Sequence, residues 1–264
     1  MANSDIVVTR HFGQTSRPDA WWLQPLFVFL GLSTFIVYAT WAAFQGAHYT
    51  FGPYISPFYS PEIFGDSIHS WFGPRPSWVP AWISPAILIL WVPAGFRLTC
   101  YYYRGAYYKS FWADPPSCTV GEPRKKYRGE HSFPLILQNF HRYFLYVAIP
   151  FLCILAHDFW EAMWFQNPGT GQTSFGIGLG TIVLGLNVLF LGGYTFGCHS
   201  FRHLIGGGMD EISKVPSCHL AYRWTSRLNS KHMVWGWTSL CWVMFSDLYV
   251  RMCSMGIWTD WRIF

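Results

Sequence analysis

The sequence predicts an all-α integral membrane protein, a bundle of five transmembrane helices. Of its 264 residues, 52% are hydrophobic and only 12% are charged, whereas a soluble domain is about 25% charged. Five stretches also reach the roughly 20 mainly apolar residues that a helix needs to cross a bilayer, and they lack the alternation of barrel strands. The segments between them are too short for a further soluble domain, so residues 1–264 are expected to form a single membrane domain. The five stretches are 21–46, 83–108, 134–162, 175–204 and 230–256.

The first three stretches carry signs of where their helices begin and bend. The apolar run from Trp21 to Phe44 is longer than the roughly 7–15 residues of a signal-peptide core, so we expect a retained span. Pro85 lies in the first turn of the second stretch, where a missing N–H costs little. Pro93 and Pro150 fall inside the second and third stretches, and they should kink those helices.

The last two stretches predict close packing and a pair of opposite charges. Glycines recur along the fourth stretch from Gly176 to Gly197, which lets another helix or a flat cofactor approach the backbone; close helix packing is the simpler interpretation. In the fifth stretch Asp247 and Arg251 are four residues apart. Side chains at this spacing lie on one face of a helix, so we expect the two charges to pair.

The basic residues predict the orientation of the bundle, because cytoplasmic connections carry an excess of Lys and Arg. Eleven Lys and Arg residues lie in the connections on one side of the membrane, whereas the connections on the other side hold only Arg75 and Arg262. The N-terminus is therefore expected inside and the C-terminus outside. Topology thus accounts for the net charge of +5, and no binding of nucleic acid is expected. The inner loop 109–133 could contact lipid headgroups or an acidic protein surface. The basic residues of the inner connections are Arg10, Arg17, Lys109, Arg124, Lys125, Lys126, Arg128, Lys214, Arg223, Arg227 and Lys231.

Side chains that can bind a metal recur at one depth near the cytoplasmic side. At 1.5 Å per residue, four of the stretches each bring a cysteine or a histidine to the inner part of a helix. Ligand-type and ionisable residues at membrane depth are costly, and by default they are functional hypotheses. His199 and His203 are four residues apart on the fourth stretch, and they compete as alternative ligands. The set with one ligand from each stretch is Cys100, His141, Cys198 and His232.

Two cysteines and two histidines are the ligand set of a Rieske-type [2Fe–2S] cluster, and also of structural zinc. Zinc has no redox chemistry, and a five-helix bundle scarcely needs a structural metal ion to stabilise it. We therefore predict the [2Fe–2S] cluster. Haem b is the alternative, with His141 paired to His199 or His203 as axial ligands. A third reading has no cofactor, with the thiols and imidazoles simply packed.

The same layer holds groups that could bind a quinone. Arginines can pair with an anionic group of a cofactor or of a lipid, and tyrosine hydroxyls can donate hydrogen bonds to a quinone headgroup. An aromatic belt at the membrane interface is the competing explanation for most of the tyrosines. The predicted quinone-binding residues are Arg97, Tyr103, Arg104, Arg202 and His203.

Several motifs resemble one known family. They are RLTCYYYRGAYY at 97–108, FWADPPSC at 111–118, NFHRYF at 139–144, GCHSFRH at 197–203 and DLYVR at 247–251. On these motifs nearly the whole chain resembles the membrane anchor subunit of an actinobacterial-type succinate dehydrogenase, a respiratory complex II.

The resemblance implies a partner set and a role. It implies a multi-pass protein of the plasma membrane, with flavoprotein and iron–sulfur subunits docked at the cytoplasmic face and electrons passing from succinate to quinone. Related single-chain anchors bind two haems b, but the outer half of this chain offers only His157 as an axial ligand. This departure favours the Cys/His cluster.

Other classes of membrane protein fit less well. A transporter or channel needs a polar path from face to face, and the outer half lacks a continuous line of polar residues. A di-iron oxygenase or desaturase needs several histidine boxes, but only His199 and His203 have a suitable spacing. A scaffold without cofactor is the remaining rival.

Overall fold

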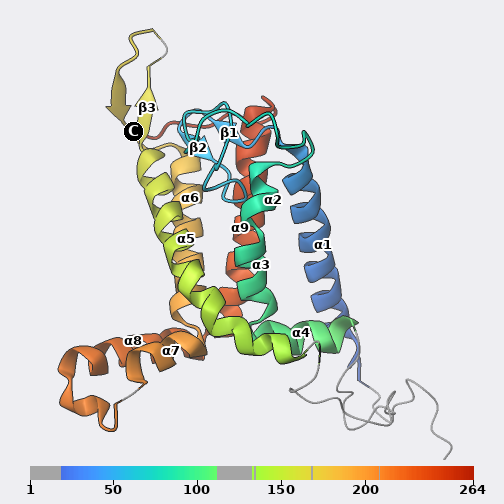
Figure 1. Ribbon diagram of the computed structural model, residues 1–264, viewed down its shortest axis with the longest axis vertical. Coiled ribbons are helices and arrows are strands. Elements are labelled where there is room, and N and C mark those ends of the chain that lie inside the picture. The colour runs from blue at the N-terminus through green and yellow to red at the C-terminus, as the bar shows by residue number, and fades with distance from the viewer. Residues whose placement is uncertain (1–18, 112–132, 134, 168, 208) are drawn as a thin grey trace, which may run out of the picture.

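The computed structural model describes residues 19–111, 133, 135–167, 169–207 and 209–264 (Figure 1). The long helices are α1 (Leu23–Gln45), α5 (His141–Glu161), α6 (Leu179–Phe196) and α9 (His232–Ser254). Helix α6 packs against both α5 and α9. Among the described residues, α1, α5 and α6 are long and apolar enough to cross a membrane. The protein is therefore a mostly helical membrane protein, as predicted.

Some sequence predictions fall outside the described residues. Most of the inner loop 109–133 does so, together with the motif residues after Phe111. The same holds for several of the basic residues used to predict orientation. These are Arg10, Arg17, Arg124, Lys125, Lys126 and Arg128.

Three predicted stretches agree well with the structure. The first stretch, 21–46, becomes α1, and the last stretch, 230–256, becomes α9. The third stretch, 134–162, opens as the 3-10 helix η1 (Leu135–Phe140) and continues as α5, which runs through Pro150.

The second predicted stretch, 83–108, is wrong as a single helix. It divides into α2 (Pro85–Ile89), α3 (Trp91–Leu98) and α4 (Tyr101–Phe111). Pro93 explains the first break, because a proline has no N–H for the carbonyl four residues earlier, which belongs to Ile89. At the second break, the Thr99 hydroxyl donates to the Gly95 carbonyl oxygen at 2.7 Å. Helix α4 then runs across the end of the bundle instead of along it (Figure 1).

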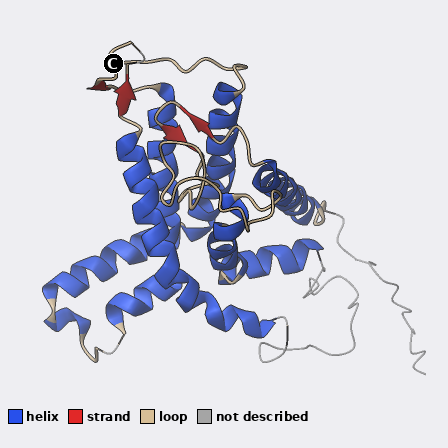
Figure 2. Ribbon diagram, turned by 45° about the horizontal axis from the view of Figure 1, so that its top comes forward, coloured by secondary structure: helices blue, strands red, loops and turns tan. Residues whose placement is uncertain are grey.

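The fourth predicted stretch, 175–204, is also wrong as a single helix. Residue 175, the first of this stretch, is the last residue of strand β4 (Thr173–Phe175), which pairs with β3 (Trp164–Gln166). The helix inside the stretch, α6, ends at Phe196. Cys198 has an extended backbone and caps α7 (His199–Gly206), its sulfur accepting the Phe201 N–H at 3.3 Å. Helix α7, η2 (Ile212–Lys214) and α8 (Pro216–Ser230) form a hairpin that projects sideways from the bundle (Figure 2).

The segment 46–84 folds over the end of the bundle where the C-terminus lies (Figure 1). It contains the short antiparallel strands β1 (Thr50–Phe51) and β2 (Tyr54–Ile55). Below it, Asp247 and Arg251 form a fully buried ion pair at 3.3 Å, which confirms the predicted pairing. We call this end of the molecule the cap end.

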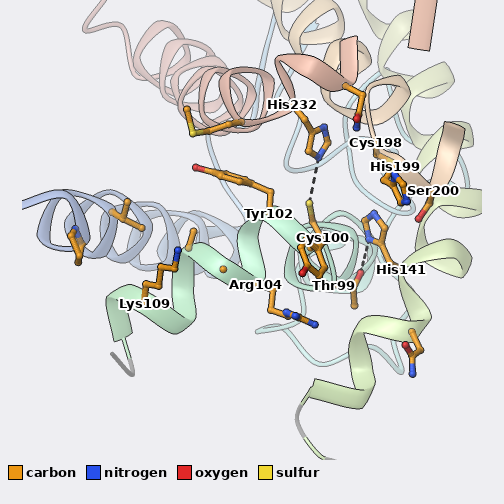
Figure 3. Close-up of a pocket in the computed structure, with 18 of the residues that line it drawn as sticks. Thr99, Cys100, Tyr102, Arg104, Lys109, His141, Cys198, His199, Ser200 and His232 are labelled. Carbon is orange, nitrogen blue, oxygen red and sulfur yellow. Dashed lines mark hydrogen bonds between the residues drawn. The ribbon is translucent and has the colours of Figure 1, made fainter. Parts of the chain in front are cut away.

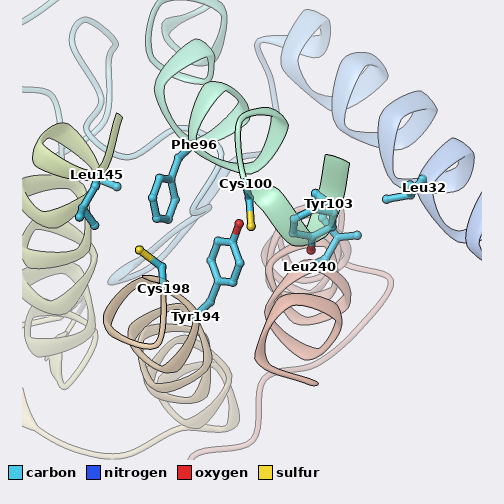
Figure 4. Packing of buried hydrophobic residues seen from close by; sticks show 9 residues of the cluster. Leu32, Phe96, Cys100, Tyr103, Leu145, Tyr194, Cys198 and Leu240 are labelled. Carbon is cyan, nitrogen blue, oxygen red and sulfur yellow. The ribbon is translucent and has the colours of Figure 1, made fainter. Parts of the chain in front are cut away.

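The core of the opposite half is built around small and aromatic residues (Figure 4). A Cβ atom added to Gly193 of α6 would lie 2.5 Å from the Trp235 ring of α9, and one added to Gly95 would lie 2.2 Å from Phe144 of α5. Such contacts require glycine, because the neighbouring rings occupy the space of a side chain. The core cluster comprises Leu32, Phe96, Cys100, Tyr103, Leu145, Ala148, Tyr194, Cys198 and Leu240.

Candidate functional site

The four predicted ligands all lie at helix boundaries. Cys100 sits directly before α4 and Cys198 directly before α7, while His141 and His232 are the first residues of α5 and α9. All four line one cavity of about 850 Å³ (Figure 3). We call the end of the bundle with this cavity the donor end, and the cavity itself the donor cavity. Four separate elements thus bring thiols and imidazoles to one place, as the sequence predicted.

Hydrogen bonds join some of these side chains. The Cys100 sulfur lies 3.5 Å from His232 Nε2, and His141 Nδ1 lies 2.9 Å from the Thr99 hydroxyl (Figure 3). Cys100 and Cys198 are 2% and 1% exposed. With Nδ1 held by Thr99, Nε2 is the nitrogen of His141 that is left to bind a further group.

Two buried polar atoms beside the cavity have no hydrogen-bond partner among the residues that the structure describes. They are Nδ1 of His232 and the hydroxyl of Tyr194, and the latter is directed toward Cys100 (Figure 4). Buried polar atoms are nearly always paired, so each exception calls for an explanation such as a bound group.

Aromatic rings fix the orientation of both histidines. The Phe96 ring stacks on His141 with centroids 4.7 Å apart, and the Tyr194 ring stacks on His232 at 4.9 Å. Phe96 and Tyr194 also meet edge to face at 5.4 Å. Because these rings are packed in the core, the imidazoles have little freedom to turn.

The alternative histidine ligands lie on α7. Nε2 of His199 lies 3.0 Å from Nε2 of His203, and only His199 lines the donor cavity. Partial burial lowers the pKa of His199, and the nearby His203 and Arg202 lower it further. His199 is therefore neutral near pH 7, the state in which an imidazole can act as a ligand.

The predicted quinone-binding residues are spread over three places. Arg104 lines the donor cavity. Arg97 donates to the Tyr103 hydroxyl at 2.8 Å, and Tyr103 donates to the backbone of α9. Arg202 instead binds Tyr222 of α8, and it shares α7 with His203. The structure thus brings Arg104 to the four ligands, while the binding roles of all five residues stay predictions.

Sequence reasoning missed the residues that hold the histidines. Thr99, Phe96 and Tyr194 were not singled out, although Tyr194 precedes Cys198 by four residues, a spacing that would place both on one face of the continuous helix expected from the sequence. That spacing could have indicated a contact. Phe96 gave no such signal, because an aromatic residue within an apolar run is ordinarily a packing residue.

No three His, Cys, Asp or Glu side chains in the described ranges are grouped closely enough to hold a metal ion. A single tetrahedral zinc ion requires four donors around one point. A two-iron cluster does not require four protein donors around one point, because each of its irons takes only two. In donor type and in number, the two thiols and two imidazoles of the cavity suit a two-iron cluster.

Fold and cavity together define a helical membrane protein in which two thiols and two imidazoles line one cavity at one end of the bundle. The chain belongs to the actinobacterial succinate dehydrogenase subunit SdhC family, whose family model matches residues 23–256. The resemblance seen in the sequence is thereby confirmed, and the chain is a membrane subunit of a succinate dehydrogenase.

A solved structure supports the same family. The chain is similar to a chain of the Mycobacterium smegmatis Sdh1 complex in the apo form, with 40% identity and a TM-score of 0.86. The match covers 97% of this chain and 96% of that chain. No curated protein sequence matches this chain.

Proposed function

We propose that this subunit anchors a succinate:quinone oxidoreductase and carries its electrons to quinone. Flavoprotein and iron–sulfur subunits dock at its cytoplasmic face, and an intramembrane Cys/His centre lies between them and the quinone. One observation carries the proposal: two thiols and two imidazoles, each from a different helix boundary, line a single cavity at one end of the bundle.

The proposal includes a topology. A single membrane domain crosses the plasma membrane five times, through α1, α2 with α3, α5, α6 and α9, with the donor end and N-terminus inside. Lys109, Lys214 and Arg227 lie in the last turns of helices at the donor end, which suits the inner face. Helices α2 and α3 cover only about 21 Å at 1.5 Å per residue. The buried part of segment 46–84 completes this crossing, because irregular backbone is tolerated at membrane depth where protein covers it.

Cys100, His141, Cys198 and His232 hold the centre, a Rieske-type [2Fe–2S] cluster that supplies one-electron redox chemistry when bound. The unpartnered Nδ1 of His232 and the matching donor set support this assignment. Within the protein, Thr99 orients His141, and the rings of Phe96 and Tyr194 keep both imidazoles in place and exclude water. His199 and His203 remain alternative ligands, and haem b remains the alternative cofactor.

Removal of both histidine ligands tests the proposal. In the assembled complex, His141→Ala with His232→Ala should lower the iron content by about two atoms and abolish quinone reduction. Succinate oxidation with a soluble electron acceptor should continue, because the docked subunits are unchanged. His219→Ala, at an exposed position of α8, is the matched control. Unchanged iron, acid-labile sulfide and activity in the double variant would contradict the proposal.

An optical spectrum separates the two cofactors. Haem b gives sharp visible bands, whereas an iron–sulfur centre gives broad absorption. The proposal predicts no haem bands that depend on this subunit.

A further inference from the structure

The hairpin of α7, η2 and α8 leaves the bundle at the donor end. It projects sideways and runs across the axis of the bundle (Figure 1, Figure 2). Neither helix can cross a membrane, because α7 has 8 residues and α8 has 15, whereas a span needs about 20. With the bundle axis along the membrane normal, the hairpin lies along the membrane surface.

One face of α8 packs on its neighbours. Arg202 of α7 donates to the Tyr222 hydroxyl. The Asn229 side chain donates to the Gly197 carbonyl oxygen, at the end of α6, at 2.7 Å. Thr225, between these two contacts, is buried. The contacts fix α8 against α7 and α6, so the opposite face of α8 is held outward.

The outward face of α8 combines exposed apolar and basic side chains. Leu220 and Trp224 are 56% and 58% exposed, and their spacing of four residues places them on one side of the helix. Arg223 and Arg227 are also exposed and have the same spacing. The guanidinium carbon of Arg227 lies 5.3 Å from the centre of the Trp224 ring, so charge and apolar surface adjoin.

The hairpin carries positive charge. Residues 199–231 contain five Lys and Arg residues and two acidic residues, so their net charge is +3. The two acidic residues are Asp210 and Glu211, and the latter pairs with Lys214 at 3.0 Å. Helix α8 itself contains no Asp or Glu. A surface of this charge attracts an anionic partner.

An anionic lipid surface matches this face better than an acidic protein does. Trp and Leu beside Arg are typical of helices that lie in the membrane interface, with apolar side chains among the acyl chains and basic ones at the phosphates. The docked subunits are proposed to lie below the end of the bundle. The hairpin extends to the side of the bundle instead (Figure 1), where lipid surrounds the spans.

We propose that the hairpin of α7 and α8 binds anionic phospholipids at the inner surface of the membrane. Arg223 and Arg227 contact the phosphates, and Leu220 and Trp224 insert among the acyl chains. The inference goes beyond the proposed function and rests on it only for the topology, which places the donor end inside.

The hairpin also joins two of the predicted ligands. Cys198 directly precedes α7. At the other end, Lys231 separates the last residue of α8 from His232. A hairpin held on the membrane surface therefore restrains the backbone at both ligands, and lipid binding steadies this part of the donor cavity.

A photoreactive phospholipid tests the surface in the assembled complex. In nanodiscs, phosphatidylglycerol with a diazirine near its headgroup should label peptides of α8 several times more than the matching phosphatidylcholine. In Arg223→Gln with Arg227→Gln, the fraction of phosphatidylglycerol that gives half-maximal label should rise about tenfold or more, because each basic residue near an anionic surface contributes about fivefold. Equal labelling by the two lipids, or an unchanged half-maximal fraction, would overturn the proposal.

Arg75→Gln with Arg262→Gln is the matched control. Both arginines are exposed at the cap end, so this variant loses the same charge while α8 is unchanged. Its label on α8 should equal that of the unchanged protein. An equal loss in this control would mean that net charge, and not the hairpin, attracts the lipid, and it would overturn the proposal.

The tryptophan tests insertion into the lipid. Trp224→Ser should lower the label from both lipids, whereas Trp78→Ser, at an 81% exposed position of segment 46–84, should not change the label on α8. A docked protein on this face would instead leave α8 unlabelled by either lipid and give amine cross-links from Lys231 to another subunit. That result would overturn the proposal.

Hydrogen exchange tests the restraint on the ligand-bearing segments. Amides of α7 and α8 should exchange several times faster in phosphatidylcholine than in phosphatidylglycerol, and this difference should disappear in Arg223→Gln with Arg227→Gln. Equal exchange in the two lipids would contradict the restraint. Labelling and exchange need no redox centre, so loss of the proposed centre would leave both unchanged, and their failure would leave the centre intact.

Discussion

A buried ion pair at the cap end and a buried imidazole at the donor end differ in how their polar atoms are paired. At the cap end, Asp247 and Arg251 are fully buried and fully paired. Tyr38 donates to Asp247 at 2.6 Å, and Arg251 donates to the Ala47 carbonyl oxygen at 2.8 Å. At the donor end, Nδ1 of His232 and the Tyr194 hydroxyl are buried without a partner in the part of the chain that the structure describes.

This difference in pairing indicates a structural role for the Asp247–Arg251 pair and a binding role for His232. A buried charge that lost its partner would be costly, so the network around Asp247 and Arg251 holds α1, α9 and segment 46–84 together. An unpaired buried nitrogen beside thiols and a cavity is costly too, and a bound group would remove that cost. The Asp247–Arg251 pair stabilises the fold, and the donor end is where we propose that a redox centre binds.

The largest expected effect is at the donor end. Cys100→Ser should abolish the iron–sulfur signal of this subunit, because a neutral hydroxyl is a poor replacement for a thiolate ligand. Cys218→Ser on α8, outside the donor cavity, is the matched control. Electron paramagnetic resonance of the reduced complex measures both variants. An intact signal in Cys100→Ser would remove Cys100 from the ligand set.

The next effect is at the cap end, where stability should change but the centre should not. Asp247→Leu leaves Arg251 buried without its counter-ion and should lower the free energy of unfolding by about 3–5 kcal/mol. Adding Arg251→Met should recover most of that loss. Denaturant unfolding in detergent measures it. If the single and double variants are equally unstable, the pair is not what holds the cap end.

Two adjacent glycines sharpen the comparison within α6. Gly193→Ala should lower stability by about 1–3 kcal/mol, because its Cβ would overlap the Trp235 ring. A Cβ atom added to Gly192 would lie 3.8 Å from the Leu152 side chain. Gly192→Ala should therefore leave stability unchanged or raise it by up to about 1 kcal/mol. Thermal unfolding of the two variants checks the packing of α6 on α9. Equal effects would show that this close approach does not matter for stability.

The smallest effect is at the Tyr194 hydroxyl. Hydrogen bonds to cluster sulfurs raise the reduction potential, and a bond of about 1 kcal/mol corresponds to about 40 mV for one electron. Tyr194→Phe should therefore lower the potential of the centre by that order, with little loss of stability. Redox titration followed by electron paramagnetic resonance measures the shift. An unchanged potential would mean that the hydroxyl does not act on the centre.

The sequence predicted what depends on local pattern. Apolar length placed α1 and α9 within two residues, and the spacing of Asp247 and Arg251 predicted their contact. The common depth of Cys100 and Cys198 also placed them in one layer, although both were expected within continuous helices.

The helix breaks could not be predicted in this way. The segments after Thr99 and Gly197 are less apolar than those before, but this gradual fall marks no particular residue as the end of a helix. The breaks depend on side-chain contacts instead: Thr99 bonds the Gly95 carbonyl oxygen, and Asn229 of α8 donates to the Gly197 carbonyl oxygen at 2.7 Å. The second contact joins residues 32 positions apart, which no local pattern can show.

The central claim is that two imidazoles of this subunit bind a redox centre. Pulsed electron paramagnetic resonance of the reduced complex, prepared with ¹⁵N-labelled histidine, tests it most directly. We predict a centre strongly coupled to two histidine nitrogens, with the coupling lost when His141 and His232 are replaced. A reduced complex in which no iron–sulfur centre couples to histidine nitrogen would contradict the account.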